Sequence, residues 1–354
     1  MKRKLLDWLC CPDCSREFAL RGVEDSTGEI IRGTLTCTSC GEYPIINGIP
    51  RILAGVRRQA GPAAMADAST PFERVQTRTR RSFGFQWTTF SSMYAAFEQN
   101  FLNYVSPLAP EDFRGRVVLD AGCGFGRHLY YAATYGAEVV GVDFSAAIES
   151  TQRNTCHLPG VHLVQCDLYQ LPFRPGVFDL VYSIGVLHHL PDPEAGFRGL
   201  LKLVKPDGAM AIWVYSTSRR GINACLEACR ALTTRLPLPL LHALSWAAGL
   251  VDWVGFILPY RLLHRWAAIR PWLERTAWSR IKLYACYPLE VCVADWFDRL
   301  AAPIRFYYGP DDLRGWSQRA MLTHVEISPT GLYGWRMFGQ RSPQSSLSEV
   351  SSVG

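Results

Sequence analysis

The chain has 354 residues, enough for two domains, and its hydrophobic fraction of 48% and charged fraction of 19% are those of an ordinary soluble globular protein. The net charge of +6 is modest, and the segment 219–282 alone carries ten basic and three acidic residues, so the rest is close to neutral. This composition argues against a disordered or uniformly basic chain. Polar residues and cysteines follow Met1 directly, so no secretory signal is predicted. Twelve cysteines in a chain expected to be cytoplasmic favour metal ligation or free thiols over disulfides.

Two C-x-x-C pairs stand near the N-terminus, and they consist of Cys11, Cys14, Cys37 and Cys40. Each pair can present two thiolates from one turn, and two pairs complete a tetrahedral zinc site. The pattern predicts a zinc ribbon over 1–54, with the neighbouring Cys10 either replacing a ligand or staying free. The ribbon is either a partner or nucleic-acid module or a structural clip, since so short a domain cannot bury enough core without a metal.

Residues 55–70 are rich in Ala, Gly and Arg without periodicity, which predicts a linker. Aromatic residues are dense over 71–110 and include Phe83, Phe85, Trp87 and Tyr94. This density favours helices that fold over the mouth of a binding site as a lid. The alternative is that the aromatic side chains cover a sheet edge.

The chain is organised around residues 117–145, which read as strand, glycine turn, helix and strand. Val117–Leu119 form the first buried strand, which Asp120 ends, and the second strand ends in Asp143 and Phe144. The turn between carries Gly122, Gly124 and Gly126, where a ligand can approach bare backbone. Such a unit binds the adenosine part of a cofactor, with the second acid accepting hydrogen bonds from ribose hydroxyls. A dinucleotide fingerprint needs a third glycine at position 127, where this chain has Arg127.

Two further strands are expected at 161–166 and 178–183, and Asp167, Leu168 and Ser183 lie at their carboxyl ends. Parallel strands place these ends at one edge of the sheet, where ligands bind beside the first strand. The convergence of Asp120, Asp143, Asp167 and Ser183 on this edge is stronger evidence than any one of them.

The run D-A-G-C-G-F-G with the later V-V-G-V-D-F-S resembles the class I S-adenosylmethionine-dependent methyltransferases. The resemblance implies an α/β fold with a seven-stranded Rossmann-like sheet over 111–218 and 301–341, and S-adenosylmethionine as the cofactor. It also implies that Asp167 meets the adenine amino group and that the glycines follow the methionine part. The first sixty residues are similar to the small zinc-binding activator subunit of translation-apparatus methyltransferases.

The segment 185–193, with His188 and His189, resembles methyltransferases related to the ubiquinone and menaquinone biosynthetic enzymes. Either histidine could be a general base, and Tyr94 is a further candidate base or acceptor-orienting group. The alternative is that one histidine packs in the core and the other bonds backbone at a helix start.

The segment 219–300 is an insertion rich in Leu, Trp and Arg where one helix is expected. Within it, 236–260 is long enough to span a bilayer, but Asp252 and two prolines count against a span. A helical cap over the active site is favoured, and peripheral membrane contact through 236–270 is the alternative, since flanking arginines suit anionic lipids. The tail 342–354 is polar and expected to be disordered.

The sequence therefore predicts methyl transfer to a bulky, partly apolar small molecule, such as a natural product or a glycan-linked or prenylated acceptor. One alternative is an rRNA or tRNA methyltransferase that uses the ribbon for RNA contact. Another is a non-catalytic scaffold that binds the cofactor. The predicted location is cytoplasmic, with or without membrane association, and neither the acceptor atom nor the oligomeric state follows from the sequence.

Overall fold

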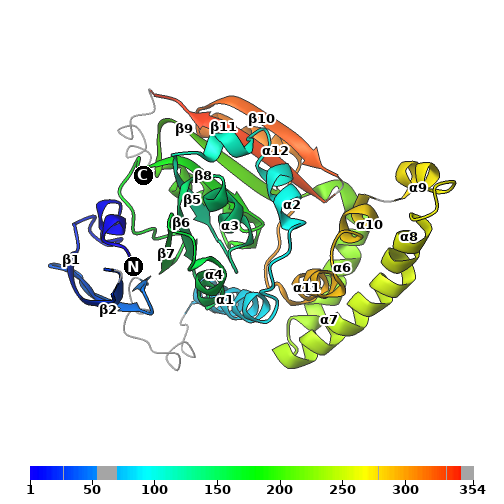
Figure 1. The fold of residues 1–354 in the computed structure, drawn as a ribbon, viewed down its shortest axis with the longest axis horizontal. Coiled ribbons are helices and arrows are strands. Elements are labelled where there is room, and N and C mark those ends of the chain that lie inside the picture. The colour runs from blue at the N-terminus through cyan, green and yellow to red at the C-terminus, as the bar shows by residue number, and fades with distance from the viewer. Residues whose placement is uncertain (27, 54–69, 278, 332, 344–354) are drawn as a thin grey trace.

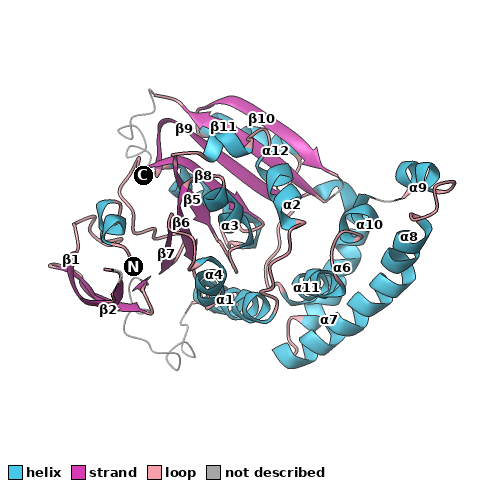
Figure 2. Cartoon of the chain, in the orientation of Figure 1, coloured by secondary structure: helices cyan, strands magenta, loops and turns pink. Residues whose placement is uncertain are grey.

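A computed structural model describes all residues except 27, 54–69, 278, 332 and 344–354. The predicted linker and tail fall almost entirely outside the described residues. The rest forms one continuous sheet with helices on both faces and a helical cap at one side (Figures 1 and 2).

The sheet has the strand order β1-β2-β3-β4-β7-β6-β5-β8-β9-β11-β10. Its seven methyltransferase-like strands, as predicted, are β5 (Val117–Ala121), β6 (Glu138–Asp143), β7 (Val161–Cys166), β8 (Phe178–Ile184), β9 (Val204–Tyr215), β10 (Leu322–Thr330) and β11 (Gly334–Arg341). The pairs β5–β6, β6–β7, β5–β8 and β8–β9 are parallel, and β11 runs antiparallel to β9 and β10. The strand order reverses at β5, so the switch point of the sheet lies between β5 and β8.

The strands β5 to β8 are buried on both faces, which their Val- and Leu-rich sequences predict. The connecting elements are α3 (Arg127–Thr134), α4 (Ile148–Thr155), η5 (Leu187–His189), α5 (Pro193–Leu201) and α12 (Pro310–Arg319). A 3-10 turn, η4 (Pro110–Phe113), leads into β5.

The N-terminal ribbon consists of η1 (Arg3–Asp7), β1 (Ala19–Glu24), β2 (Ile30–Cys37), β3 (Gly41–Ile46) and β4 (Ile49–Ile52). Its last strand pairs in parallel with β7, Arg51 opposite Gln165 and Ile52 opposite Cys166. The ribbon thus extends the large sheet and covers an edge that would otherwise expose unpaired backbone groups.

The ribbon and the large sheet also share one hydrophobic core. Leu9 forms a bridge with Phe173, and the Cys10 amide donates to the Pro172 carbonyl at 3.0 Å. Leu5 and Leu9 belong to the same buried cluster as Val164 and Phe173. This packing supports the structural clip over a detachable recruitment module.

Between the ribbon and β5 the described residues form the α-helices α1 (Pro71–Thr89) and α2 (Phe97–Val105). Thr70 and Glu73 form a capping box that fixes the start of α1. Gln86 of α1 donates to the Ala294 carbonyl of the cap at 3.0 Å, so α1 is held against the cap rather than against a sheet edge.

The insertion after β9 and the 3-10 turn η6 (Thr217–Arg219) is helical, as predicted. It comprises α6 (Arg220–Thr233), α7 (Leu238–Asp252), the π-helical turn η7 (Trp253–Ile257), α8 (Leu258–Leu263), α9 (Arg270–Thr276), α10 (Ser279–Tyr284) and α11 (Leu289–Ala301). The helix Leu238–Leu263 is long and apolar enough to cross a membrane by length and composition, and 28% of its most apolar window is buried. In Figure 1, α11 lies between this helix and α1.

Candidate active site

A cavity of about 320 Å³ opens at the carboxyl ends of β5, β6 and β7, between α1, α2 and the cap. Its wall includes Gly122, Gly124, Asp143, Phe144, Asp167 and Leu168, six residues that the sequence predicts as cofactor contacts. The sheet therefore brings most of the predicted cofactor residues to one place.

The glycine turn after β5 needs glycine at each of the three predicted positions. Gly122, Gly124 and Gly126 have φ values of +90°, +57° and +87°. A Cβ at Gly122 would lie 2.4 Å from a methyl carbon of Val186, and one at Gly126 would lie 2.8 Å from a methyl carbon of Thr151. Side chains at these positions would displace the walls of the turn.

Asp143 is fixed by three donors at the end of β6. Its carboxylate accepts from the Gly124 amide at 3.0 Å and from the amide and hydroxyl of Ser145 at 2.7 and 2.6 Å. Burial raises the pKa of Asp143, and these donors oppose that shift. The carboxylate thus ties the glycine turn to β6 while it faces the cavity.

Asp167 at the end of β7 is held in the same way. It accepts from the Tyr169 amide at 3.0 Å, and Gln76 of α1 donates to it at 3.3 Å. The bond from Gln76 connects α1 directly to the predicted adenine end of the site, and a lid role for this helix stays a prediction.

Asp120 and Ser183 lie behind the cavity wall and join β5 to β8. Tyr182 donates to Asp120 at 3.0 Å, and the Ser183 hydroxyl donates to the Ala121 carbonyl at 2.9 Å. Burial raises the pKa of Asp120 to about 7, against the hydrogen bond from Tyr182. Direct contact of these two residues with the cofactor stays a prediction, and the structure gives them a role in positioning the turn.

The two predicted histidines have different surroundings. His189 lines the cavity, its Nδ1 lies 2.7 Å from the Ile304 carbonyl, and its Nε2 lies 3.8 Å from a carboxylate oxygen of Asp298. Because Nδ1 must donate to a carbonyl, Nε2 carries the lone pair in the neutral ring. His188 is buried behind it, with its ring centroid 4.0 Å from that of Tyr215 and both nitrogens unpartnered among the described residues. His189 is therefore the better placed of the two as a proton acceptor.

Tyr94 also lines the cavity, and its hydroxyl donates to Glu290 of α11 at 2.6 Å. Burial raises the pKa of Tyr94, and the neighbouring carboxylate adds to the shift. A tyrosine that holds its proton in this way suits orientation of an acceptor rather than removal of a proton from it.

The structure adds a polar end of the cavity that sequence reasoning did not assign. Tyr215 donates to Asp298 at 2.7 Å, and Arg305 forms an ion pair with the same carboxylate. Arg219 also lines the cavity, with its guanidinium 4.5 Å from the Tyr333 ring centroid and no carboxylate within 4 Å in the described part of the chain. In the sequence, only the D-W-F-D run at 295–298 could have indicated this polar end, but the same pattern is typical of an ordinary amphipathic helix.

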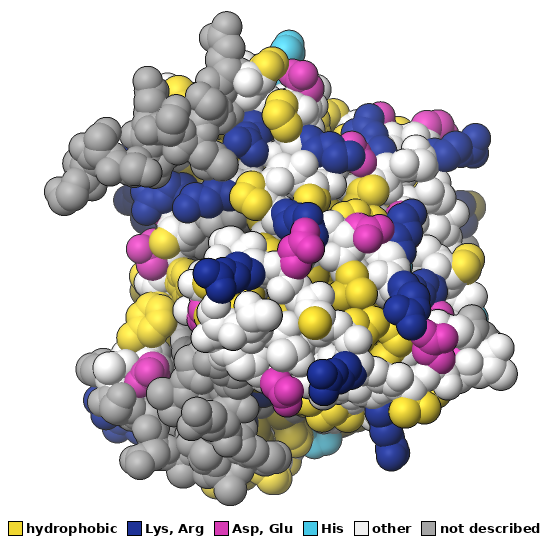
Figure 3. All heavy atoms as spheres, turned by 90° about the vertical axis from the view of Figure 1, so that its left-hand side faces the viewer, with side chains coloured by type: hydrophobic (Ala, Val, Ile, Leu, Met, Phe, Trp, Pro, Cys, Tyr) yellow, Lys and Arg dark blue, Asp and Glu magenta, His cyan; other side chains and the backbone are white. Residues whose placement is uncertain are grey.

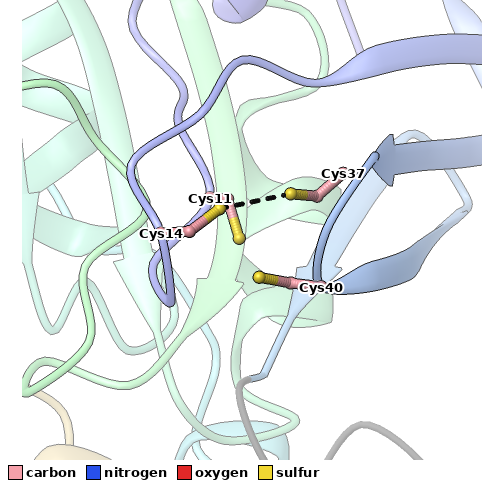
Figure 4. A group of neighbouring side chains, drawn as sticks. All are labelled: Cys11, Cys14, Cys37 and Cys40. Atoms are coloured by element: carbon pink, nitrogen blue, oxygen red, sulfur yellow. Dashed lines mark hydrogen bonds between the residues drawn. The ribbon is translucent and has the colours of Figure 1, made fainter.

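The four predicted zinc ligands come together at the ribbon's two turns. The sulfur atoms of Cys11, Cys14, Cys37 and Cys40 all lie within 4.8 Å of one another (Figure 4). Zinc–sulfur bonds of about 2.3 Å in a tetrahedron require sulfurs roughly 3.8 Å apart, so this donor set fits a zinc ion. Cys10 lies outside the group, is buried, and donates its amide to the Pro172 carbonyl in the segment between β7 and β8.

Comparison with known proteins places this chain in a family. Residues 119–212 match a model described as a methyltransferase domain. A ubiquinone biosynthesis O-methyltransferase of Pectobacterium carotovorum is 30% identical over 177 residues, which cover 49% of this chain and 69% of that protein. An uncharacterized Synechococcus protein is 34% identical over 152 residues, which cover 41% of this chain and 34% of that protein. A solved magnesium protoporphyrin IX methyltransferase from Synechocystis aligns at a TM-score of 0.44 and 16% identity, covering 75% of this chain and all of that one.

The chain belongs to the class I S-adenosylmethionine-dependent methyltransferases. It is an enzyme of that class, with S-adenosylmethionine as its methyl donor. The chain spans about a third of the Synechococcus relative and about two thirds of the ubiquinone enzyme.

Replacing Asp143 with Ala is expected to weaken S-adenosylmethionine binding roughly 10- to 100-fold, because a hydrogen bond to a charged group contributes about 1.5–3 kcal/mol. Isothermal titration calorimetry measures the change. Glu111→Ala, which removes an acid from the distant turn η4, is the control and should bind as the wild type. Equal affinities of the two variants would contradict the role of Asp143.

The buried histidines predict a loss of stability in acid. Burial lowers the pKa of His189 to about 4, against the attraction of Asp298. An unfolded histidine has a pKa of about 6.5, so the unfolded chain binds more protons between these values and stability falls as the pH drops from about 6.5 toward 4. The full effect at this one residue is roughly 3 kcal/mol. His128 and His188 shift in the same direction.

Thermal unfolding between pH 7 and 4.5 tests this expectation. His189→Asn can still donate to the Ile304 carbonyl, and its unfolding midpoint should depend less steeply on pH than that of the wild type. Parallel pH curves for the two proteins would show that His189 titrates equally in the folded and unfolded states.

Proposed function

We propose that this enzyme methylates a bulky, partly apolar small molecule, such as a natural product or a glycan-linked or prenylated compound. The observation that carries the proposal is the cavity, which residues of α1, α2 and the cap line together with the strand ends. One part of its wall is aromatic and the other is polar. The aromatic part includes Phe83, Trp87, Phe90, Phe97, Trp213, Tyr284 and Tyr287.

The wall favours an acceptor with an apolar body and a polar reacting end. Phe83 packs 4.8 Å from the His189 ring, centroid to centroid, so the aromatic surface reaches the proposed proton acceptor. Tyr215, Asp298 and Arg305 form a linked polar group beside it. No carboxylate among the described residues lies within 4 Å of the Arg219 guanidinium, although Asp295 attracts it from farther away, and this suits an anionic or strongly polar substituent on the acceptor.

When bound, S-adenosylmethionine supplies a methyl group already activated by its sulfonium. The protein's contribution is to position the acceptor and exclude water. His189 is placed to take the acceptor's proton at Nε2, and Asp298 to stabilise the resulting imidazolium. Asp143, Asp167 and the glycine turn would hold the nucleoside and methionine parts.

RNA as acceptor has less support. The cap's exposed arginines are interleaved in the sequence with Trp and Leu residues. One edge of the ribbon is already paired with the large sheet, through β4 and β7. On the ribbon side of the molecule, Lys and Arg side chains are interspersed with acids and apolar groups (Figure 3). A non-catalytic scaffold has less support still, because the acids of the cofactor seat are in place and lie at the cavity.

The acceptor class is tested with host extract, purified enzyme and methyl-labelled S-adenosylmethionine. Label is expected in the organic-soluble, nuclease-resistant fraction. Label in nuclease-sensitive material would favour RNA, and absence of S-adenosylhomocysteine with any fraction would favour the scaffold. Phe83→Ala should lower kcat/KM for the labelled acceptor about tenfold or more, since burying a Phe side chain is worth ~1.5–3 kcal/mol. Phe72→Ala on the same helix changes an exposed ring and should not.

We also propose that the four-cysteine group binds one structural zinc ion. Elemental analysis of the purified protein should give one zinc per chain, and Cys37→Ser should lose it and lower the thermal midpoint, because the ribbon shares its core with the large sheet. Cys10→Ser is the matched control, since Cys10 lies outside the group, and it should keep its zinc. A metal-free wild type, or loss of zinc in Cys10→Ser alone, would refute the assignment.

A further inference from the structure

The helix Leu238–Leu263 exposes an apolar face to solvent and buries its one acidic residue, whereas a helix of a soluble protein ordinarily does the reverse. Its inward face carries Leu241, Ser245, Gly249 and Asp252, all buried. Its outward face, at the alternating spacing of three and four that defines one side of a helix, is apolar. The residues of this outward face are Leu240, Leu244, Ala247, Val251 and Val254, and Leu250 and Phe256 lie beside them.

The inward face is fixed by packing and by charge, so the helix cannot simply rotate. A Cβ at Gly249 would lie 2.7 Å from a methyl carbon of Val293 in α11, which shows how closely the two helices cross. Asp252 accepts from Arg280 at 2.9 Å and from the Trp296 indole at 2.9 Å. The acid that argued against a membrane span from sequence is thus paired inside the cap, away from the exposed face.

Exposed apolar, aromatic and cationic side chains continue along the chain after this face. Leu240, Leu244, Leu250, Val251, Val254 and Phe256 are between 39% and 70% exposed, and Leu262 and Leu263 extend the face into α8. Trp266 and Trp272 follow at 65% and 61% exposure. The same stretch contains four arginines with exposed side chains, Arg261, Arg265, Arg270 and Arg275, and Glu274 is the one exposed acid among the described residues of 236–277.

We propose that α7, η7, α8 and α9 form a monotopic docking surface for a lipid bilayer that contains anionic headgroups. Leucine and valine would enter the acyl boundary, the tryptophans would lie at headgroup level, and the arginines would meet lipid phosphates. A span is not required, because the opposite face of the same helix is packed on α11. A protein partner would have to match an apolar stripe bordered by arginines and tryptophans, which is the composition of an interfacial helix.

The docking surface lies one helix away from the acceptor cavity. α11 packs against α7 through Val293 and Phe297, while its Glu290, Val291 and Asp295 line the cavity. This proximity suits an acceptor that is itself dissolved in the bilayer. The lipid surface is inferred from the helix alone and does not depend on which acceptor the enzyme methylates.

Vesicle flotation of the full chain, without acceptor or S-adenosylmethionine, tests the proposal. The wild type should float with vesicles of phosphatidylcholine and phosphatidylglycerol, and less with pure phosphatidylcholine or at high salt. Val251→Glu should lower vesicle partitioning about tenfold or more, because it removes an exposed valine that the bilayer would bury and adds an acid at an anionic surface. Val23→Glu is the matched control: Val23 is 69% exposed against 70% for Val251, but it lies on the ribbon strand β1.

Arginine variants separate charge from apolar burial. Arg265→Glu with Arg270→Glu should abolish the preference for phosphatidylglycerol, while Arg265→Lys with Arg270→Lys should keep it. Circular dichroism and calorimetric S-adenosylmethionine binding check that each variant is folded. A folded wild type that does not float would overturn the proposal. So would sedimentation showing a dimer that Val251→Glu dissociates, which would assign the face to a second copy.

Discussion

The site depends on the tight turn that joins β5 to α3. Its three glycines have backbone conformations that L side chains avoid, and its walls leave no space for a Cβ at Gly122 or Gly126. The turn is not held by its own sequence alone. Val142 of β6 accepts from the amides of Gly122 and Cys123, and Asp143 accepts from the amide of Gly124. The neighbouring strand therefore both shapes the turn and supplies the carboxylate beside it, so that the two halves of the cofactor seat are positioned by one set of hydrogen bonds.

The ribbon adds to this framework rather than standing apart from it. Because β4 pairs with β7, the ribbon is attached to the strand that ends in Asp167. Arg51 also donates to Gln165, and the Gln165 amide donates to the Ser145 carbonyl at 3.1 Å beyond the end of β6. A bound metal would rigidify the turns of the ribbon, and the shared core would pass that stability to the sheet edge. These contacts connect the ribbon to the sheet edge beside Asp143 and Asp167.

Local patterns were sufficient for the parts of the site that lie within one strand and its following turn. The valine runs, the glycines, Asp143 and Asp167 each carry their signal within a few residues. The polar end of the cavity has no such signal, because Tyr215 ends β9, Asp298 lies in α11 and Arg305 follows it, and only the folded cap brings them together. The pairing of Ile52 with Cys166 was missed for the same reason, since the sequence of a strand does not indicate which distant strand it pairs with. The sequence also could not show that Asp120 and Ser183 face the β5–β8 contact, because residues at a strand end differ in exposure according to what packs above them.

The cap differs from an ordinary soluble helical domain in two ways: it buries ion pairs, and it exposes an apolar helix face. A soluble helix turns its ionic residues to water, where desolvation costs nothing, but Asp252, Arg280, Asp295 and Arg299 are paired inside the cap. Burial opposes the charged form of Asp252, and the bonds from Arg280 more than offset it, so the pKa of Asp252 is held below its ordinary value. Asp295 of the same group also lines the cavity. The ionic group gives the cavity a polar wall on one side of α11, and the exposed side chains of α7 on the other side are apolar or aromatic. The ion pairs inside the cap and the apolar surface of α7 are both compatible with the proposed contact with a lipid bilayer.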